Sequence, residues 1–531
     1  MHNSLVGAIA MLPTAMAAPT SQNITMVTDW SQLAPVSEVQ WTPCFANFTC
    51  MRLQVPLDYA NASVGTAAIA FVKFAAANET KNTKNILFNP GGPGGSGIDM
   101  VMTRAATAFT TMFGAEHNFI GFDPRGVQHS EPSVDCFHGD RKLASNFAWG
   151  YNENSPVLST ENLNAMFRRY GDYSDFCSKQ LNESARYVGT MAVATDLLTF
   201  AEKQEQANGG DPKDAKLYYA GYSYGTILGS TFASMFPNRV GGLMIDGVSS
   251  LAEYYAGTWT SSMWTADDAI KSLFKYCHAA GPQQCAFYND TAEAIEIRYR
   301  QLLARLRDDP IAVSDLSVVE VPGVWATFSA LRVAFFRAAY SPEDSFPAFA
   351  QVLVDLENRN GSSLVAMLGG GPCYECDTSK IAWQGDLAGI AIACLDRDGR
   401  FPINTKEEWK RIFTAQMSMS ELAGETGMTI QCRNWAFHPP PSQQFTGKIG
   451  SNTSTPLLIL SNTIDPATPL ISAQEMHSAF PGSALLVNEA VGHATFNAPS
   501  DCVFKHIKEY FSSGALPPVN TTCKPNTYPF L

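Results

Sequence analysis

Residues 217–225 read Leu-Tyr-Tyr-Ala-Gly-Tyr-Ser-Tyr-Gly and carry the strongest structural signal in the chain. The run at 217–220 predicts a buried strand, and the text from Tyr224 to Phe236 predicts the helix that follows it. The glycines on both sides of Ser223 allow a sharp turn from strand to helix, which lifts the serine hydroxyl clear of the sheet. A serine in this G-x-S-x-G context is typical of a nucleophile.

A second glycine-rich turn lies earlier in the chain. Residues 85–89 predict a strand that leads into Pro-Gly-Gly-Pro-Gly-Gly-Ser-Gly at 90–97. The string lacks both Gly-Lys-Ser/Thr and the GxGxxG spacing, so it does not indicate a phosphate loop. In folds with a G-x-S-x-G turn between a strand and a helix, the loop after an early strand supplies a backbone N–H that binds the oxyanion. Glycine in that loop permits the backbone to approach the oxyanion closely. We expect the N–H groups of Tyr224 and Gly92 to form the oxyanion hole.

A serine hydroxyl needs a base to take its proton. Two later strands are predicted, at 456–460 and 484–487, and they are followed by Asp465 and His493 respectively. The residues occur in the order serine, acid, histidine, and each follows a strand. This is the order expected when the serine lies on a G-x-S-x-G turn, the nucleophile elbow. We therefore expect Ser223, Asp465 and His493 to be the catalytic residues. Asp246 is the alternative acid. It ends the predicted strand that follows the helix after Ser223.

Composition limits what the chain can bind. The 531 residues are 45% hydrophobic and carry 36 Lys and Arg against 49 Asp and Glu, a net charge of −13. The apolar content excludes disorder, and the negative charge disfavours nucleic acid as a partner. After the first residues, no apolar run reaches the roughly 18 residues of a membrane helix, so we expect no membrane insertion.

The first residues predict a secretory signal. An apolar run at 5–12 is followed by Ala-Met-Ala-Ala-Pro at 15–19, and cleavage after Ala17 fits the small-residue rule. We expect a secreted protein, with a vacuolar location as the alternative. Nine N-x-S/T sequons, at Asn23, Asn47, Asn61, Asn78, Asn182, Asn289, Asn360, Asn452 and Asn520, predict N-glycans.

Twelve cysteines agree with an oxidising compartment. Four pairs lie close in sequence: Cys44 with Cys50, Cys136 with Cys177, Cys277 with Cys285, and Cys502 with Cys523. Cys373, Cys376, Cys394 and Cys432 allow three pairings, and the sequence alone does not choose among them. For the C-x-x-C at 373–376 we expect a structural disulfide, because zinc would need a second close ligand pair.

Five strings together resemble one family. They are Gly-Gly-Pro-Gly-Gly-Ser-Gly at 91–97, Asp-Pro-Arg-Gly at 123–126, Gly-Tyr-Ser-Tyr-Gly-Thr at 221–226, Asp-Pro-Ala-Thr-Pro at 465–469 and Gly-His-Ala-Thr-Phe at 492–496. The chain resembles the secreted tripeptidyl aminopeptidase-like branch of the α/β-hydrolases, which is related to the prolyl iminopeptidases. The resemblance implies a serine exopeptidase with the triad Ser223, Asp465 and His493. His129 and Asn89 depart from the family pattern, and both bear on substrate preference.

The predicted fold is α/β, of the α/β-hydrolase type, with a mostly parallel central sheet and an inserted helical cap. The sequence before residue 250 predicts alternating strands and helices. The following segment is rich in aromatic residues and predicts helices, and strands are predicted again near the end. The expected segments are a signal peptide at 1–17, a lead-in at 18–40, the first part of the core at 41–250, the cap at 251–430 and a TAP-like second part of the core at 431–531.

The expected function is an aminopeptidase that releases short N-terminal peptides or residues through an acyl-enzyme, without a metal or organic cofactor. Such an enzyme must bind a free ammonium, and the carboxylates available in the first cap segment are Glu253, Asp267 and Asp268. A carboxylesterase or lactonase acting on a small ester is the alternative, because the cap also holds Tyr254, Tyr255, Trp259 and Trp264. A hydrolase-like binding protein without activity is an alternative of another class.

Overall fold

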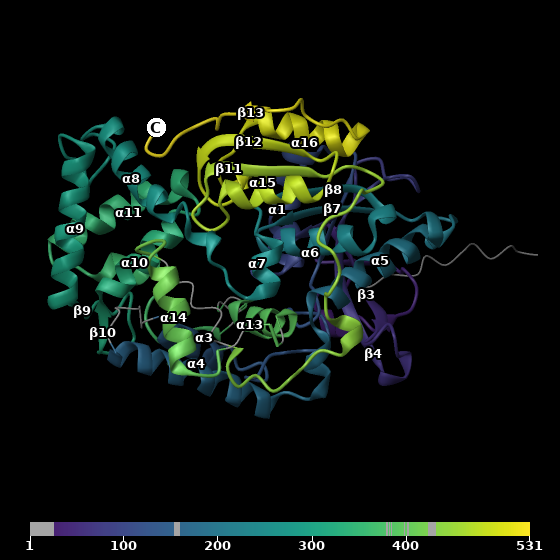
Figure 1. Cartoon of the computed structure of the whole chain (residues 1–531), viewed down its shortest axis with the longest axis horizontal. Helices are drawn as coiled ribbons and strands as arrows, with labels where there is room; N and C mark the ends of the chain where they lie inside the picture. The colour runs from purple at the N-terminus through teal and green to yellow at the C-terminus, as the bar shows by residue number, and fades with distance from the viewer. Residues whose placement is uncertain are drawn as a thin grey trace, which may run out of the picture.

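Strand β7 (Leu217–Tyr222) lies near the middle of an 11-stranded sheet with the order β1-β3-β4-β6-β5-β7-β8-β11-β12-β13, and β2 pairs with β3 (Figure 1). From β6 to β13 every pairing is parallel, while β2, β3, β4 and β6 pair antiparallel. The other strands are β1 (Pro35–Val36), β2 (Thr42–Cys44), β3 (Phe48–Pro56), β4 (Thr66–Phe74), β5 (Asn85–Asn89), β6 (Asn118–Phe122), β8 (Val240–Asp246), β11 (Leu458–Ile464), β12 (Ala484–Val491) and β13 (Thr522–Cys523). The predicted mostly parallel sheet is confirmed.

The computed structural model describes residues 26–152, 160–378, 381, 383, 385–397, 399–400, 403–422 and 432–531. The predicted signal peptide, its cleavage after Ala17 and the sequon at Asn23 lie outside the described residues.

Helices cover both faces of the sheet because successive strand residues point to opposite sides. Phe88 belongs to a core with α1 (Gly97–Arg104), the π-helical turn η3 (Ala105–Phe109), α2 (Thr110–Phe113) and α16 (Asp501–Ser513). Its neighbour Leu87 belongs to the opposite core, with α5 (Thr190–Ala207), α6 (Tyr224–Met235) and α15 (Leu470–Ala479). This is the three-layer arrangement that an α/β sheet needs.

A helical layer with its own apolar core lies beside the sheet, at the left of Figure 1. It contains α8 (Ala266–Ala280), α9 (Ala292–Asp308), α10 (Phe328–Ala338), α11 (Pro342–Glu357), α12 (Ser362–Met367) and the hairpin β9 (Ile311–Val313) and β10 (Val324–Ala326). The short helix α7 (Leu251–Ala256) leads into this layer from β8. Phe530, near the carboxyl terminus, is buried in the same core, so the end of the chain ties the cap to the sheet.

Helices from an earlier stretch also join the cap. The segment between β6 and α5 forms α3 (Arg141–Asn152) and α4 (Thr160–Gln180), which lie next to α13 (Gly385–Asp396) and α14 (Lys406–Met417) in Figure 1. Leu163 and Met166 of α4 pack against Trp409 and Phe413 of α14 in one small core. The cap is thus built from two separate insertions, although the sequence pattern indicates one.

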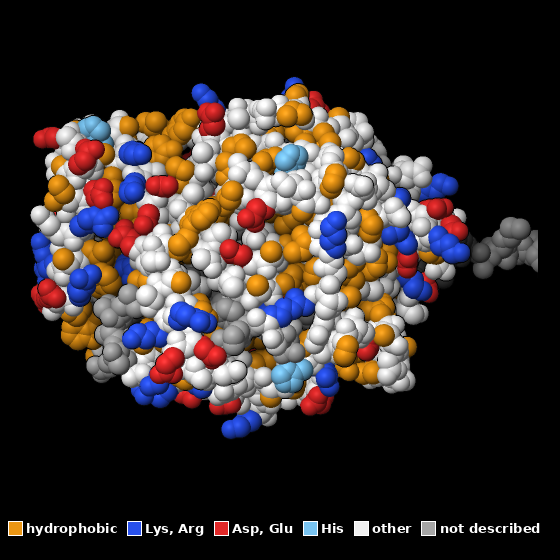
Figure 2. Space-filling model, viewed as in Figure 1, with side chains coloured by type: hydrophobic (Ala, Val, Ile, Leu, Met, Phe, Trp, Pro, Cys, Tyr) orange, Lys and Arg blue, Asp and Glu red, His pale blue; other side chains and the backbone are white. Residues whose placement is uncertain are grey.

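Six disulfides are formed. They join Cys44–Cys50, Cys136–Cys177, Cys277–Cys285, Cys373–Cys376, Cys394–Cys432 and Cys502–Cys523. The structure thereby selects one of the three pairings that the sequence leaves open. Among the described residues, no helix combines the length and the apolar character of a membrane span. On the face shown in Figure 2, Lys and Arg are interspersed with Asp and Glu.

Candidate active site

Ser223 sits on the turn between β7 and α6 with φ 57° and ψ −125°. A non-glycine residue with this φ is strained by about 1–3 kcal/mol, which the surrounding structure must offset. Part of that support is the bond from Ser223 N–H to the Asp246 carbonyl, at 3.1 Å. A Cβ at Gly225 would lie 2.7 Å from the Asn89 carbonyl oxygen, so the elbow excludes a side chain there. The turn is the one that the motif predicts.

The imidazole of His493 is paired with Asp465. Its Nδ1 lies 3.0 Å from Asp465 Oδ1 and 3.2 Å from Oδ2, and Thr468 Oγ1 lies 3.1 Å from the same nitrogen. The carboxylate also accepts the N–H groups of Ala467, Thr468 and Ala494 at 3.0, 2.8 and 2.8 Å. With Nδ1 held by the carboxylate, Nε2 is the ring nitrogen left for chemistry.

The two groups stabilise each other's charged forms. Burial alone would raise the pKa of Asp465, but the charge and hydrogen bond of His493, with the backbone donors, lower it. Burial alone would lower the pKa of His493, but the charge and hydrogen bond of Asp465, with the more distant Asp246, raise it. The pair is poised to accept a proton on the ring.

Asp246 has a different partner. Its carboxylate accepts the Thr495 N–H at 2.8 and 3.1 Å and the Thr495 hydroxyl at 2.9 Å. Burial raises the pKa of Asp246 to about 6, although the Thr495 bonds oppose the shift. Asp246 therefore braces the loop that carries His493, and Asp465 is the carboxylate hydrogen-bonded to the imidazole.

Ser223, Asp465 and His493 lie at one edge of the sheet because β7, β8, β11 and β12 are parallel neighbours whose carboxyl ends meet there. Contacts between the loops bring the elbow and the histidine loop together. The rings of Tyr222 and Phe496 lie 5.8 Å apart, and a Cβ at Gly247 would lie 2.9 Å from the Cβ of Ala494. The sequence order places the three residues on strand ends, and the topology places those ends side by side.

The glycine-rich loop lies against the elbow. A Cβ at Gly91 would lie 2.8 Å from Ser223 Cβ and 3.0 Å from Tyr224 N. The Gly91 N–H donates to Asn89 Oδ1 at 2.9 Å and is therefore occupied, and the oxyanion role of the Gly92 N–H stays a prediction. Tyr224 N–H lies at the first position of α6, where a helix offers no acceptor of its own.

The cap rests on this loop. The indole N–H of Trp383 donates to the Gly94 carbonyl at 3.0 Å, and Gly385, the first residue of α13, contacts Gly94. From the other side, the ring of Tyr340, between α10 and α11, lies 4.5 Å from that of His493, and the His493 N–H donates to the Tyr340 carbonyl at 2.9 Å. Neither Trp383 nor Tyr340 belongs to a motif that sequence reasoning could have used.

A cavity of about 630 Å³ lies between α3, α10 and the loop before α13. Its charged lining is Glu320, Asp377 and Asp386 with one arginine, Arg337. Burial and the charges of Asp465 and Asp386 raise the pKa of Tyr340, so Asp386 acts within electrostatic reach of the ring that packs on His493. The described residues that line this cavity include neither Ser223 nor His493.

The three cap carboxylates considered from the sequence are engaged elsewhere. Glu253 accepts the Ser261 N–H at 2.9 Å, Asp267 accepts the Ser420 hydroxyl at 2.6 Å, and Asp268 lies 3.8 Å from Lys271 at the surface. The aromatic residues of the same segment are also mainly structural. Tyr254 is buried with its hydroxyl on Asp396, Tyr255 is buried with its hydroxyl next to Thr231, and Trp264 is exposed.

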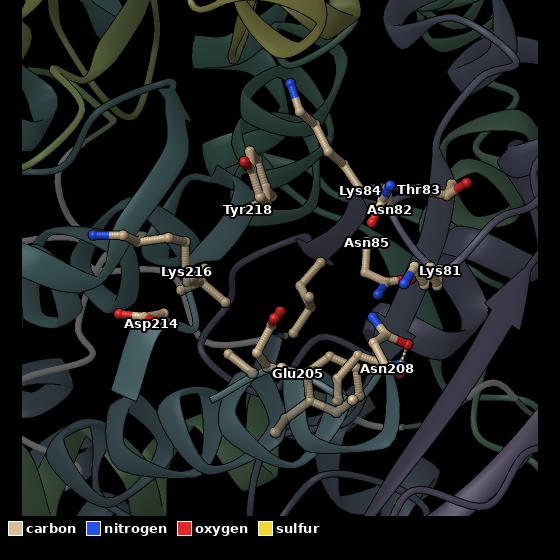
Figure 3. A pocket seen from close by; sticks show the side chains of 17 residues that line it. Lys81, Asn82, Thr83, Lys84, Asn85, Glu205, Asn208, Asp214, Lys216 and Tyr218 are labelled. Atoms are coloured by element: carbon tan, nitrogen blue, oxygen red, sulfur yellow. Dashed lines mark hydrogen bonds between the residues drawn. The ribbon is translucent and has the colours of Figure 1, made fainter. Parts of the chain in front are cut away.

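Two further features are distinct from this site. A cavity of about 410 Å³ lies at the amino-terminal ends of β5 and β7, the opposite sheet edge from Ser223 (Figure 3). Lys84 and Lys216 line it, but their ammonium groups bond to the carbonyls of Phe511 and Asn238 and point away from the cavity. These two lysines therefore do not make the cavity an anion site.

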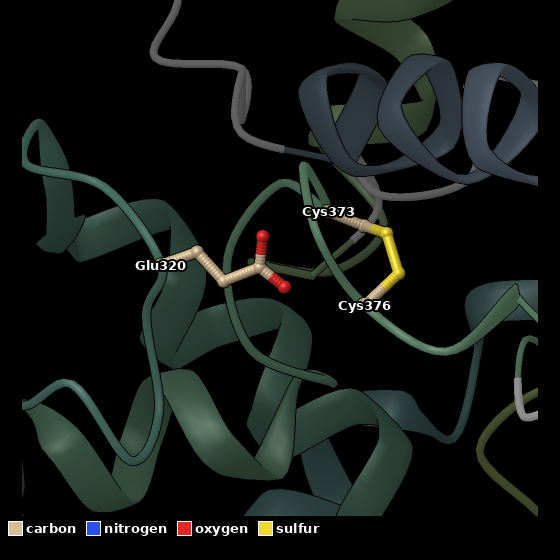
Figure 4. Close-up of side chains that lie close together, drawn as sticks. All are labelled: Glu320, Cys373 and Cys376. Carbon is tan, nitrogen blue, oxygen red and sulfur yellow. A yellow bond between two sulfur atoms is a disulfide. The ribbon is translucent and has the colours of Figure 1, made fainter.

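Glu320, Cys373 and Cys376 also lie close together (Figure 4). The two sulfurs are bonded to each other, and Glu320 accepts the N–H groups of Tyr374 and Glu375 at 2.6 and 2.7 Å. This arrangement fixes a loop and offers no thiolate to a metal, in agreement with the structural disulfide expected there.

Comparisons with known proteins agree with the α/β-hydrolase fold. Residues 84–270 match the family model described as the alpha/beta hydrolase fold, and residues 420–523 match the one described as TAP-like protein. Among curated relatives, Serine protease Hip1 of Mycobacterium tuberculosis is 28% identical over 511 residues, 91% of each chain. Tripeptidyl aminopeptidase of Streptomyces lividans is 24% identical over 508 residues, covering 92% of this chain and 87% of the relative. Carboxylesterase B of Mycobacterium tuberculosis is 24% identical over 482 residues, covering 90% and 86%.

Solved structures that resemble the chain include a proline iminopeptidase from Mycobacterium smegmatis, at 13% identity and TM-score 0.30, covering 87% of this chain and 100% of that one. A thermophilic esterase from Thermogutta terrifontis is similar at 13% identity and TM-score 0.35, covering 87% and 99%.

Proposed function

We propose that this serine hydrolase of the α/β-hydrolase fold is a secreted aminopeptidase that releases short peptides or single residues from free amino termini. The observation that carries the proposal is the His493–Asp465 pair at the sheet edge where the strained Ser223 turn ends β7. Relatives named serine protease and tripeptidyl aminopeptidase, each aligned over about nine-tenths of the chain, support the peptidase class.

The proposed reaction is acyl transfer to water. His493 Nε2 takes the proton of Ser223 as the serine oxygen attacks the carbonyl carbon, and Asp465 stabilises the imidazolium. The N–H groups of Tyr224 and Gly92 donate to the oxyanion, a contribution of about 3 kcal/mol for each such donor. The imidazolium then protonates the leaving amine as the scissile bond breaks. Water, deprotonated by His493, attacks the acyl-enzyme, releases the acid and restores Ser223.

Selection of a free amino terminus needs a negative charge in the acyl-binding region. Asp386 is our candidate, because it lines the 630 Å³ cavity together with two more carboxylates and one arginine. The charge of Asp386 also acts on Tyr340, whose ring packs on that of His493, which supports the choice. A buried or half-buried ammonium–carboxylate bond is worth about 1.5–3 kcal/mol, or roughly 10- to 100-fold in affinity.

The predicted secretion remains part of the proposal. Six disulfides support an oxidising compartment, with the vacuole as the alternative to the extracellular space. We likewise propose the signal peptide at 1–17, N-glycans at the exposed sequons, and a main cap segment at 251–430 between the two parts of the core, to which α3 and α4 of the earlier insertion are added.

A carboxylesterase is the second candidate function, favoured by the relative named Carboxylesterase B. Three substrates separate the two: a tripeptide amide with a free amine, its N-acetylated form, and a simple aryl ester. An aminopeptidase cleaves the first at least tenfold better than the second. Equal cleavage of the two peptides, or cleavage of the ester alone, contradicts the aminopeptidase.

Two variants and one probe assign the residues. Asp386→Asn should raise KM for the free-amine peptide about tenfold or more, while Asp268→Asn, which removes a surface carboxylate of α8, should not change it. A fluorophosphonate probe should label the wild-type protein and not Ser223→Ala. A wild-type protein that resists the probe would instead support the inactive binding protein.

A further inference from the structure

A second cavity, of about 350 Å³, has His493 in its wall. It lies on the face of the sheet that α1 covers, and Tyr222, Phe496 and the end of α1 line it. Because His493 gives its proton to the leaving group, the part of the substrate that departs must lie against the imidazole. A cavity that shares the imidazole is therefore suited to the leaving group, as the larger cavity at Asp386 is to the acyl part.

The wall of this cavity contains side-chain donors that have no acceptor partner within the described part of the chain. Arg104, the last residue of α1, is exposed and stacks over the ring of Phe496, with its guanidinium carbon 4.4 Å from the ring centroid. Among the residues that the structure describes, no carboxylate forms an ion pair with Arg104. The stacking fixes the plane of the guanidinium at the mouth of the cavity, which reduces the entropy lost when it binds a planar anion.

A second donor lies deeper in the same wall. Tyr222 is 4% exposed, and its hydroxyl has no hydrogen-bond partner within the described part of the chain. The charge of Arg104 acts on this hydroxyl and opposes the rise in the pKa of Tyr222 that burial and Asp246 cause. A buried hydroxyl without a partner costs free energy, and a bound acceptor would remove that cost.

One carboxylate, Asp99, also lines the cavity and has to be considered. Burial raises the pKa of Asp99, and the side chain of Gln128 and the charge of Arg141 oppose the rise. Arg104 is not among the groups that act on Asp99. The charge of Arg104 remains available to a ligand.

From these contacts we propose that Arg104, with the Tyr222 hydroxyl, binds a carboxylate of the leaving group and makes the enzyme prefer substrates whose departing part is anionic. The carboxylate can be the acidic side chain of the residue after the scissile bond or the free carboxyl end of a short leaving peptide. The proposal rests on the acyl transfer at Ser223 proposed above, and it does not depend on whether the acyl part is a peptide.

The test compares leaving groups in matched pairs. One free-amine peptide is prepared with three leaving residues: glutamine amide, glutamate amide and glutamine with a free carboxyl end. A second pair, 4-acetoxybenzamide and 4-acetoxybenzoate, carries the same contrast on an ester. For the wild-type enzyme we expect kcat/KM to be about three- to tenfold higher for the carboxylate member, the range for a partly exposed charged hydrogen bond. The two peptide acids show which carboxylate is bound.

Arg104→Gln should bring the ratio of kcat/KM for the carboxylate substrate to that for the amide substrate close to one. Arg104→Lys should give a ratio between one and the wild-type value. Using a ratio cancels differences in the fraction of folded enzyme. The matched control is Arg307→Gln in α9, which removes another exposed arginine that stacks on a phenylalanine, 4.6 Å from the Phe328 ring, and should keep the wild-type ratio.

The outcomes separate this proposal from the proposed function. Loss of the preference in Arg104→Gln alone supports the subsite. A wild-type ratio near one, or a ratio unchanged in Arg104→Gln, overturns it even if the peptides are cleaved. Hydrolysis of the esters without any peptide cleavage refutes the aminopeptidase, and the ester pair then still decides the role of Arg104.

Discussion

Replacing Asp465 by asparagine tests the central pair of the site. The change keeps the oxygen that accepts the Ala467 and Thr468 N–H groups and puts an NH₂ group where Oδ2 faces Ala494 N–H and His493 Nδ1. The kept oxygen lies 3.0 Å from Nδ1 and the new NH₂ group 3.2 Å from it. We expect the NH₂ group to donate to Nδ1, because the kept oxygen already accepts two backbone N–H groups, and the ring proton then moves to Nε2. That nitrogen can then no longer accept the proton of Ser223.

The expected loss has two parts. In a serine hydrolase the wrong tautomer lowers kcat by about 10⁴, which corresponds to roughly 5.5 kcal/mol of transition-state stabilisation. The Ala494 N–H also loses its acceptor, which costs about 1–3 kcal/mol of folding stability. Asp246→Asn is the matched control. It leaves the imidazole with Asp465, keeps one oxygen for the Thr495 N–H, and removes a nearby charge and the second acceptor oxygen, so we expect at most about a tenfold loss.

The assay is kcat on an ester or peptide that the wild-type enzyme cleaves, together with the rate of fluorophosphonate labelling. Thermal unfolding of each variant shows that the fold is retained. An Asp465→Asn enzyme that keeps activity within tenfold of wild type, with Asp246→Asn the more damaged variant, would refute the assignment of the acid.

Three further predictions follow from the same contacts. Because Asp465 raises the pKa of His493 above its usual 6.5 and the base must be neutral, kcat/KM should fall with decreasing pH with a midpoint above 6.5; a midpoint at or below 6.5 in a pH–rate profile contradicts this. Gly91→Ala would place its Cβ 2.8 Å from Ser223 Cβ at a φ of 102°, so kcat should drop at least 100-fold, as after loss of an oxyanion donor, with the protein still folded by circular dichroism. Arg125→Met leaves the fully buried Asp196 without the guanidinium that now lies 2.7 Å away, and should lower the urea unfolding free energy by about 3–5 kcal/mol; a change below 1 kcal/mol would show that the pair is not needed.

The sequence predicts the elements that bear the site well because each motif follows a strand. The sequence does not predict the full length of a strand whose polar residues form hydrogen bonds inside the sheet. Strand β11 continues through the polar stretch at 461–464 rather than ending at 460, since Asn462 donates to the carbonyls of Gly492 and Ala494 at 2.8 and 2.7 Å. Those bonds join the strand that ends at the acid to the loop that carries the histidine. No alternation of apolar and polar residues records them.

Residues supplied by the cap could not be predicted for a related reason. Trp383 and Tyr340 reach the site only because α13 rests on the glycine-rich loop and the α10–α11 junction packs on His493. Their positions depend on how two insertions dock, and a local pattern carries no information about that. The position of Arg104 at the second cavity likewise depends on its contact with Phe496, which lies nearly 400 residues later in the sequence.

The neighbouring carboxylates at the ends of β8 and β11 are set apart by what surrounds them. Both are fully buried, but Asp465 has the imidazole and three backbone donors, which lower its pKa, whereas Asp246 has only the amide and hydroxyl of Thr495, and burial raises its pKa to about 6. Two buried groups whose pKa values are driven in opposite directions take different tasks. Asp465, whose lowered pKa favours the ionised form, can stabilise an imidazolium. Asp246 has no imidazole partner, and its carboxylate instead holds the loop that carries His493 through Thr495. The surroundings of the two side chains, which are both aspartates, therefore set their different roles.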